Sequence, residues 1–162
     1  MSSKPIPGRY TADVQGDVTV FHIGMRFNNF RAVRSWWPVF TAMPRMLKEL
    51  SQDKESGMLG YQLLLGWPRL LYVVQYWESP EKLLAYAADQ GKEHRPAWAA
   101  FNRRLREGRG KVGFWHETFI SRPGSYENVY INMPPFGLAA ATGGPVPVAR
   151  RGERAADRLK AA

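Results

Sequence analysis

Two apolar runs in the middle of the chain constrain the fold more than any other feature. MLGYQLLLGW and LLYVVQYW are rich in aromatic and branched side chains, and only a short link around Gly66, Pro68 and Arg69 separates them. Apolar runs of this length joined by a Gly/Pro turn are typical of a β-hairpin. The fold must therefore accommodate a pair of antiparallel strands near the centre of the chain.

Helical patterns lie on both sides of this hairpin. Residues 30–50 carry apolar side chains at three- and four-residue spacings, and Pro38 and Pro44 within them predict a kinked helix or two short ones. After the hairpin, SPEKLLAYAADQG combines a serine N-cap with proline at the first helical position and a closing glycine. A further helix is predicted over residues 96–106.

Two more segments have the composition of strands. VTVFHIGM precedes the first helix, and KVGFWHETFI follows the last one. The resulting order, β-α-β-β-α-β, predicts an α+β, ferredoxin-like domain in which the last strand pairs with the first. His22 and His116 would then lie on neighbouring strands, where they could face the same side of the sheet.

Composition divides the chain into three parts. Residues 1–16 are polar and contain Pro and Gly, so we expect an arm that lies over the domain or over a partner. Residues 17–142 hold the ferredoxin-like domain, and the whole chain of 162 residues suits a single domain. Residues 143–162 are expected to form a mobile basic tail.

The absence of cysteine excludes disulfides, thiolate catalysis and zinc–thiolate sites. The N-terminus lacks the apolar segment of a secretory signal, and no run approaches the roughly 18 apolar residues of a membrane span. We therefore expect a soluble, cytoplasmic protein with no membrane partner. The net charge of +9 is not accompanied by a helix-turn-helix or RNP-type motif, so specific nucleic-acid binding is not expected.

Three histidines are the main candidates for chemistry near neutral pH. His116, in VGFWHETF, could transfer protons or bind a metal or haem iron, or it could be a core histidine with a satisfied hydrogen bond. His94 lies between two predicted helices and is either a haem ligand or a solvated loop residue. His22 is interpreted as structural. Their spacing contains neither HxH nor HxxxH, so we predict no metal site.

Arg26 and Asn132 are the other candidate site residues. Arg26 ends the first predicted strand, where it could bind a substrate acid or a cofactor propionate or simply lie at the surface. Asn132 is a polar residue in an apolar setting. The sequence contains neither GxGxxG nor a Walker pattern, so nothing supports a nucleotide or flavin cofactor.

Several blocks of the sequence resemble one known family. DVTVFHIGMRFN, WWPVFTAMPRMLKEL, GYQLLLGWPRLLYVVQYWES and VGFWHETF followed by SYENVYINMPPFGL are similar to the fumagillin-pathway-monooxygenase-like family, formerly a domain of unknown function. The resemblance implies a dimeric α+β barrel, in which two ferredoxin-like sheets pack together as a homodimer. An exposed apolar sheet face would also favour a homodimer, and the residues expected to share it are Tyr61, Leu63, Leu65, Tyr72, Val74 and Tyr76.

The C-terminal half also resembles the haem aldoxime dehydratases. HRPAWAAFNRRL, FWHETF and SYENVYIN follow the order in which those enzymes carry a helix with the iron-ligating histidine and a strand with a catalytic histidine. His116 matches the strand histidine. His94 lies near the place of the ligand, and Ala97 is the other position that matches it. This resemblance makes haem b a candidate cofactor, whereas cofactor-free monooxygenases among the first family's relatives need none.

Three functions follow from these resemblances. The first is a monooxygenase-like oxidoreductase that acts on an apolar or aromatic small molecule between sheet and helices. In it, His116 would be the base, and Arg26 or Asn132 would stabilise the developing anion. The second is a haem-binding dehydratase or peroxygenase. The third is a barrel that binds a small ligand or haem without turnover. We expect the first.

Overall fold

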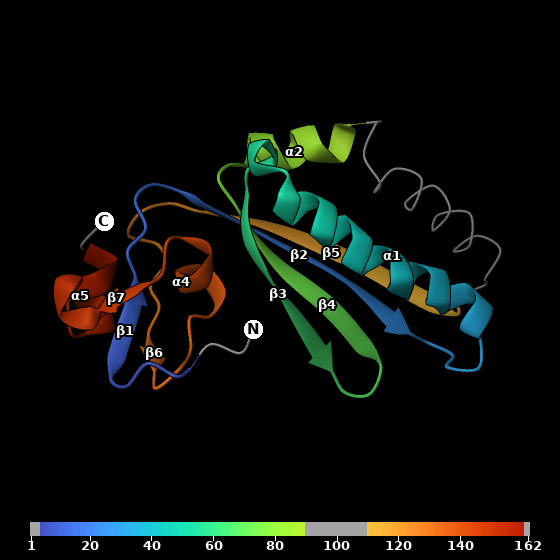
Figure 1. The fold of residues 1–162 in the computed structure, drawn as a ribbon, viewed down its shortest axis with the longest axis horizontal. Helices are drawn as coiled ribbons and strands as arrows, with labels where there is room; N and C mark the ends of the chain where they lie inside the picture. Colours follow the sequence, from blue (N-terminus) through green and yellow to red (C-terminus); the bar gives the residue numbers. More distant parts are fainter. Residues whose placement is uncertain (1–3, 90–109, 161–162) are drawn as a thin grey trace.

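The computed structural model describes residues 4–89 and 110–160, and Figure 1 shows their arrangement. The strands are β1 (Arg9–Ala12), β2 (Val18–Phe27), β3 (Met58–Gly66), β4 (Leu70–Trp77), β5 (Val112–Ser121), β6 (Tyr130–Ile131) and β7 (Pro145–Pro147). The helices are α1 (Val33–Gln52), α2 (Pro80–Ala88), α4 (Gly137–Ala141) and α5 (Ala155–Lys160), with 3-10 turns η1 (Lys54–Ser56) and η2 (Val148–Arg150). No helix in the described part of the chain is long and apolar enough to cross a membrane. The helix predicted over residues 96–106 lies outside the described residues.

An antiparallel four-stranded sheet forms the centre of the fold, in the order β3-β4-β2-β5. β3 and β4 form the predicted hairpin. The predicted pairing of the last long strand with the first is confirmed, because β5 runs antiparallel to β2 along its whole length. The protein is thus an α+β fold built on antiparallel sheet.

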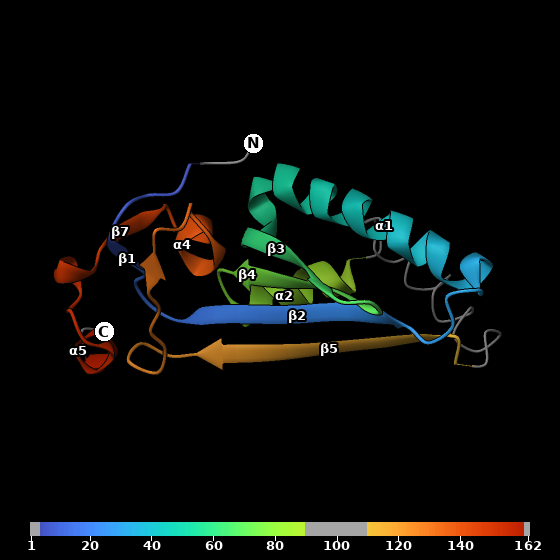
Figure 2. The same ribbon diagram turned by 90° about the horizontal axis from the view of Figure 1, so that it is seen from below.

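The side chains of β2 alternate between two faces of this sheet. One face, which we call the helix face, carries Thr19, Phe21, Ile23 and Met25, and the other, the far face, carries Val18, Val20, His22 and Gly24. Met25 packs in a cluster with Trp36 of α1, and Phe21 packs in a cluster with Leu83 of α2. Both helices therefore cover the helix face, and α1 runs along it in Figure 2.

The two first helices begin much as the sequence indicates, but α1 is not divided. It continues through both Pro38 and Pro44, so the alternative of two short helices is wrong. Side chains near both ends of α1, Trp36 and Leu50, are anchored in core clusters. This packing outweighs the amide hydrogen bonds that the prolines remove. α2 has the predicted N-cap, in which the Ser79 hydroxyl accepts a hydrogen bond from a backbone amide.

A three-stranded sheet, in the order β6-β1-β7, lies at one end of the molecule together with α4 and α5 (Figure 1). β1 comes from the predicted arm, and β7 comes from the segment predicted to be a mobile tail. That expectation for the tail is wrong, because β7 pairs with β1 and Val148 is buried. Residues 145–160 are part of the folded protein.

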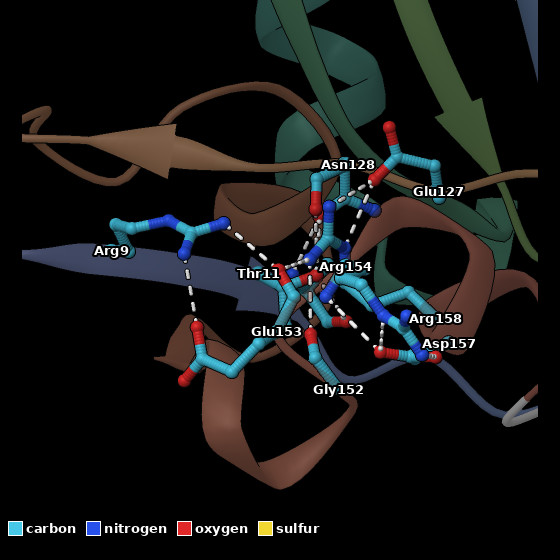
Figure 3. A network of polar contacts seen from close by, with 10 residues as sticks. Arg9, Thr11, Glu127, Asn128, Gly152, Glu153, Arg154, Asp157 and Arg158 are labelled. Atoms are coloured by element: carbon cyan, nitrogen blue, oxygen red, sulfur yellow. Dashed lines mark hydrogen bonds and ion pairs between the residues drawn. The ribbon is translucent and has the colours of Figure 1, made fainter.

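Arg158 holds α5 against this end of the molecule, as Figure 3 shows. Its side chain is only 5% exposed, and its guanidinium donates hydrogen bonds of 2.9 and 2.8 Å to the Glu127 carboxylate. It donates two more to the backbone carbonyls of Gly152 and Glu153. Both of the hydrogen bonds to Glu127 reach the same oxygen, Oε2, and charge-assisted bonds of this kind are short and strong. The sequence RRGERAADRLK does not indicate it, because arginines in such a charged stretch are usually solvated.

The pairing register corrects two expectations about the faces of the four-stranded sheet. His22 lies opposite Glu117, and His116 lies opposite Ile23, so the two histidines face opposite sides of the sheet. The six apolar residues expected to share one face also divide between both. Tyr61, Leu63 and Leu65 pair with the helix-face residues Gln75, Val73 and Leu71, whereas Tyr72, Val74 and Tyr76 lie on the far face. A shift of one residue in register accounts for each difference.

Candidate functional site

His116 lies on the helix face of β5, among aromatic rings. Its imidazole is 5.8 Å from the Phe21 ring and 6.1 Å from the Phe114 ring, measured between centroids. Phe21 and Phe114 both contact core clusters that the helices form with the sheet. The imidazole itself is exposed. A histidine in this position can exchange protons with a molecule that rests against the aromatic rings.

Buried polar groups lie further along the same face. The Trp77 indole N–H donates a 3.0 Å hydrogen bond to the Gln75 side chain, and both residues are buried. Thr19 is fully buried beside Trp77, and its hydroxyl has no hydrogen-bond partner among the residues that the structure describes. The Tyr86 ring lies 5.7 Å from that of Trp77, and burial raises the pKa of its hydroxyl well above the usual range, with Glu49 adding to the effect. These hydroxyls remain protonated and can act as neutral hydrogen-bond groups.

The far face carries a second group of titratable and aromatic side chains, which the sequence did not predict. His22 and Glu117 are directly opposed on β2 and β5, so their Cβ atoms are about 4.5–5.5 Å apart. The rings of Tyr72, Trp115 and Phe119 surround His22, with centroids 6.4, 6.3 and 5.5 Å away. A carboxylate beside an imidazole can orient it as a base. Glu117, which follows His116 in the sequence, therefore lies beside His22 on the far face and not beside His116.

Gly24 allows this aromatic cluster to close over the sheet. A Cβ atom at this position would lie 2.6 Å from the Tyr72 Cβ and 2.7 Å from the Trp115 Nε1. Both distances are far shorter than a normal contact, and neither neighbour is the free end of a flexible chain. The Trp115 indole therefore packs directly against the backbone of Gly24.

Replacement of Gly24 by alanine is expected to lower the free energy of unfolding by about 1–3 kcal/mol, because the added methyl group overpacks this contact. Urea denaturation measures the effect. Gly113→Ala is the matched control, since a Cβ there has its nearest neighbour at 3.5 Å. Equal stability of the two variants would show that the cluster can shift aside.

Arg26 and Asn132 are not brought together with His116. Arg26 pairs with Gly113 near the start of β5, on the far face, and its guanidinium hydrogen-bonds the Asn28 side chain. Asn132 follows β6 in the other sheet, where its side chain accepts a 2.9 Å hydrogen bond from the Gly8 amide. Its left-handed φ of 52° suits a turn that ties the N-terminal segment in place. The proposed roles of both residues in stabilising an anion stay predictions.

Two tyrosines meet where α4 lies near the four-stranded sheet. A Cβ on Gly137 would be 3.2 Å from the Tyr76 hydroxyl and 3.5 Å from that of Tyr130. The Tyr130 oxygen accepts a hydrogen bond from the Ala139 amide. Burial raises the pKa of both hydroxyls, and the neighbouring Tyr130 raises that of Tyr76 further. Both are therefore neutral at physiological pH and join the two parts of the fold.

The haem alternative depends on His94, which lies outside the described residues. Among the residues that the structure describes, no group of three or more His, Asp or Glu side chains is positioned to hold a metal ion. Haem binding stays a prediction. An absorption spectrum of the purified protein would decide it, because haem gives an intense Soret band.

Comparison with known proteins identifies related sequences. The model of the family described as "Monooxygenase af470-like" matches residues 18–138, which include the whole four-stranded sheet and His116. The curated protein "Monooxygenase af470" of Aspergillus fumigatus is 29% identical over 130 residues, which are 75% of this chain and 45% of that protein. The chain thus spans about half the length of this relative.

Solved structures with a similar arrangement are more distant. SnoaB from Streptomyces nogalater, a cofactor-independent oxygenase, has a TM-score of 0.41 at 13% identity, over 67% of this chain and 95% of its own. A conserved protein from Bacteroides thetaiotaomicron, of unknown function and titled a possible oxidoreductase, has a TM-score of 0.40 at 14% identity, over 65% and 99% of the two chains.

Proposed function

Because the chain belongs to the monooxygenase af470-like family, we propose that it is a monooxygenase-like oxidoreductase acting on an apolar or aromatic small molecule. The family description and the curated relative supply the reaction class. The aromatic surroundings of His116 on the helix face favour a flat apolar substrate over a charged one. The observation that carries the proposal is that the matched region contains a histidine exposed beside these rings.

His116 is the proposed base. A neutral imidazole carries a free nitrogen lone pair, which can accept a proton from a molecule held against the ring. The rings of Phe21 and Phe114 would hold the substrate by apolar contact and limit access of water to the reacting carbon. We propose no direct role for Asn132, because its side chain is engaged with Gly8.

The proposed substrate contains a methylene group made acidic by neighbouring aromatic rings or a carbonyl group. Neutral His116 removes one proton from this carbon, and dioxygen oxidises the resulting carbanion with formation of a carbon–oxygen bond. The peroxide anion that results takes back the proton from the His116 imidazolium, and the hydroperoxide then loses its second carbon-bound hydrogen and a hydroxide as water, which yields a carbonyl group. One oxygen atom of dioxygen enters the product and the other enters water, so no external reductant is required.

Oxygen consumption by the full chain tests this proposal, with anthrone as the probe because it contains such a methylene group. The purified protein is expected to accelerate oxygen uptake above the spontaneous rate, with one dioxygen consumed for each probe molecule. Heat-denatured protein is the control. An uptake rate equal to this control, for anthrone and for a panel of related aromatic ketones, would argue against the proposed function.

We also propose that two copies associate through the far face, as in a dimeric α+β barrel. Phe119 is exposed on this face, and its ring lies near His22, as do the rings of the partly buried Trp115 and Tyr72. Such apolar groups favour a protein partner. Light scattering at micromolar concentration is expected to give about twice the chain mass of 18.4 kDa. Phe119→Asp should shift this mass towards that of the monomer, and a parent protein that is already monomeric would contradict the dimer.

A further inference from the structure

The end of the molecule opposite the three-stranded sheet exposes large apolar side chains. Trp67, in the turn between β3 and β4, is 95% exposed, and Leu65 beside it is 79% exposed. In and just before α1, the exposed large apolar residues are Phe30, Val33, Trp37 and Phe40. Figure 1 shows that the start of α1 and the β3–β4 turn lie at this same end. A tryptophan so fully in water at a turn contributes nothing to the core, which points to a binding role.

Contacts between the two segments make this end one surface. The Arg69 guanidinium donates hydrogen bonds to the carbonyls of Phe27 and Asn28 and lies 5.0 Å from the centre of the Phe30 ring. Phe30 stacks on Phe27, whose ring contacts Trp36. The Trp36 ring in turn contacts those of Trp37 and Phe40. The β3–β4 turn is thus fixed to the start of α1 rather than projecting independently.

The charged residues of the two segments that form this surface are all basic. Residues 18–48 contain five basic residues and no Asp or Glu, and residues 56–77 contain Arg69 as their only charged side chain. Arg26, Arg31 and Arg34 are exposed. Lys111 is exposed as well, and its carbonyl accepts hydrogen bonds from the amides of Asn28 and Asn29, which places it at this end.

We propose that this surface docks on the interface of a lipid bilayer that contains anionic lipids. Tryptophan and phenylalanine favour the boundary between headgroups and acyl chains, and neighbouring arginines and lysines are attracted to anionic headgroups. This surface has both exposed aromatic side chains and basic side chains, and residues 18–48 and 56–77 contain no Asp or Glu. The expectation of no membrane partner was based on the absence of a membrane-spanning segment. The surface proposed here would lie on the bilayer without crossing it.

Two other occupants suit the surface less well. A second copy docked through the same surface would place its arginines against those of the first, which is unfavourable without acidic partners. A nucleic acid would satisfy the arginines, but the aliphatic side chains Val33 and Leu65 would be desolvated without gaining contacts from phosphates. A bilayer accommodates both the aliphatic and the basic groups.

Cosedimentation with vesicles tests the proposal on the full chain. Vesicles of phosphatidylcholine with phosphatidylserine are expected to bind the protein at least about tenfold more tightly than vesicles of phosphatidylcholine alone, with weaker binding at high salt. The double variant Leu65→Ser with Trp67→Ser and the double variant Arg31→Glu with Arg34→Glu should each weaken binding by about tenfold or more. These side chains are exposed, so both variants should fold.

Ile120→Ser is the matched control, because Ile120 is 55% exposed at the opposite end of β5. It should leave vesicle binding unchanged. The proposal is overturned if the parent does not sediment with anionic vesicles, or if Ile120→Ser weakens binding as much as the turn variant. It is also overturned if light scattering shows that the turn variant loses a dimer while vesicle binding persists.

Discussion

Replacement of Arg158 by methionine is expected to lower the free energy of unfolding by about 2–4 kcal/mol, although the residue lies near the end of the chain. The variant removes both hydrogen bonds that the Glu127 carboxylate accepts from Arg158, and it removes a donor from the carbonyls of Gly152 and Glu153. Glu127 is partly exposed, which keeps the loss below that of a fully buried pair. Urea denaturation measures the change.

Arg154→Ala provides the comparison within the same helix region. Arg154 pairs with Asp157 at 3.0 Å but is highly exposed, so its loss should leave the free energy of unfolding almost unchanged. Removal of residues 145–162 should be more damaging than either variant, since β7 and buried Val148 are lost with Arg158. A truncated chain with unchanged stability would mean that this segment does not pack as the structure shows.

Replacement of His116 by glutamine is expected to lower the rate of probe oxidation by at least about 100-fold, because a positioned general base typically contributes this much. Its effect on the free energy of unfolding should stay within about 0.5 kcal/mol, since His116 is exposed. Oxygen uptake and urea denaturation of the same preparation measure both quantities. A loss of activity without a loss of stability distinguishes a base from a structural histidine.

His22→Gln and Glu117→Gln are the control variants for this assignment. They alter the imidazole and the carboxylate of the far face, where His22 is enclosed by aromatic rings. Both should retain most of the activity of the parent protein. If they abolish oxygen uptake while His116→Gln remains active, the base is the far-face pair and the proposed assignment is wrong.

The sequence predicted the four strands of the larger sheet and the helices α1 and α2 in their order, because each of these segments carries a local signal, whereas it did not predict the sheet β6-β1-β7. The apolar runs of β3 and β4 with their Gly/Pro turn, and the Ser79 cap of α2, are such signals. The pairing of β5 with β2 followed from that order alone. These features depend on composition and spacing within a few residues, which a single sequence contains.

The candidate site was predicted less completely, because register and long-range contacts have no local signal. His22 pairs with Glu117, whereas the expected arrangement pairs it with a residue one position away. Because side chains alternate between the two faces of a strand, this difference of one residue moves His116 to the opposite face from His22. The burial of Arg158 depends on Glu127, 31 positions earlier in the chain. The charged composition of the C-terminal segment predicted solvation because it contains no sign of that partner.

Oxidation of anthrone under dioxygen labelled with the heavy isotope of oxygen tests the central claim most directly, with mass spectrometry of both product and water. The account predicts one labelled oxygen atom in the product carbonyl and the other in water, at a rate that depends on His116. Unlabelled oxygen from solvent in the newly formed carbonyl group would contradict the proposed mechanism. Formation of the product at the same rate by the His116→Gln variant would contradict it as well.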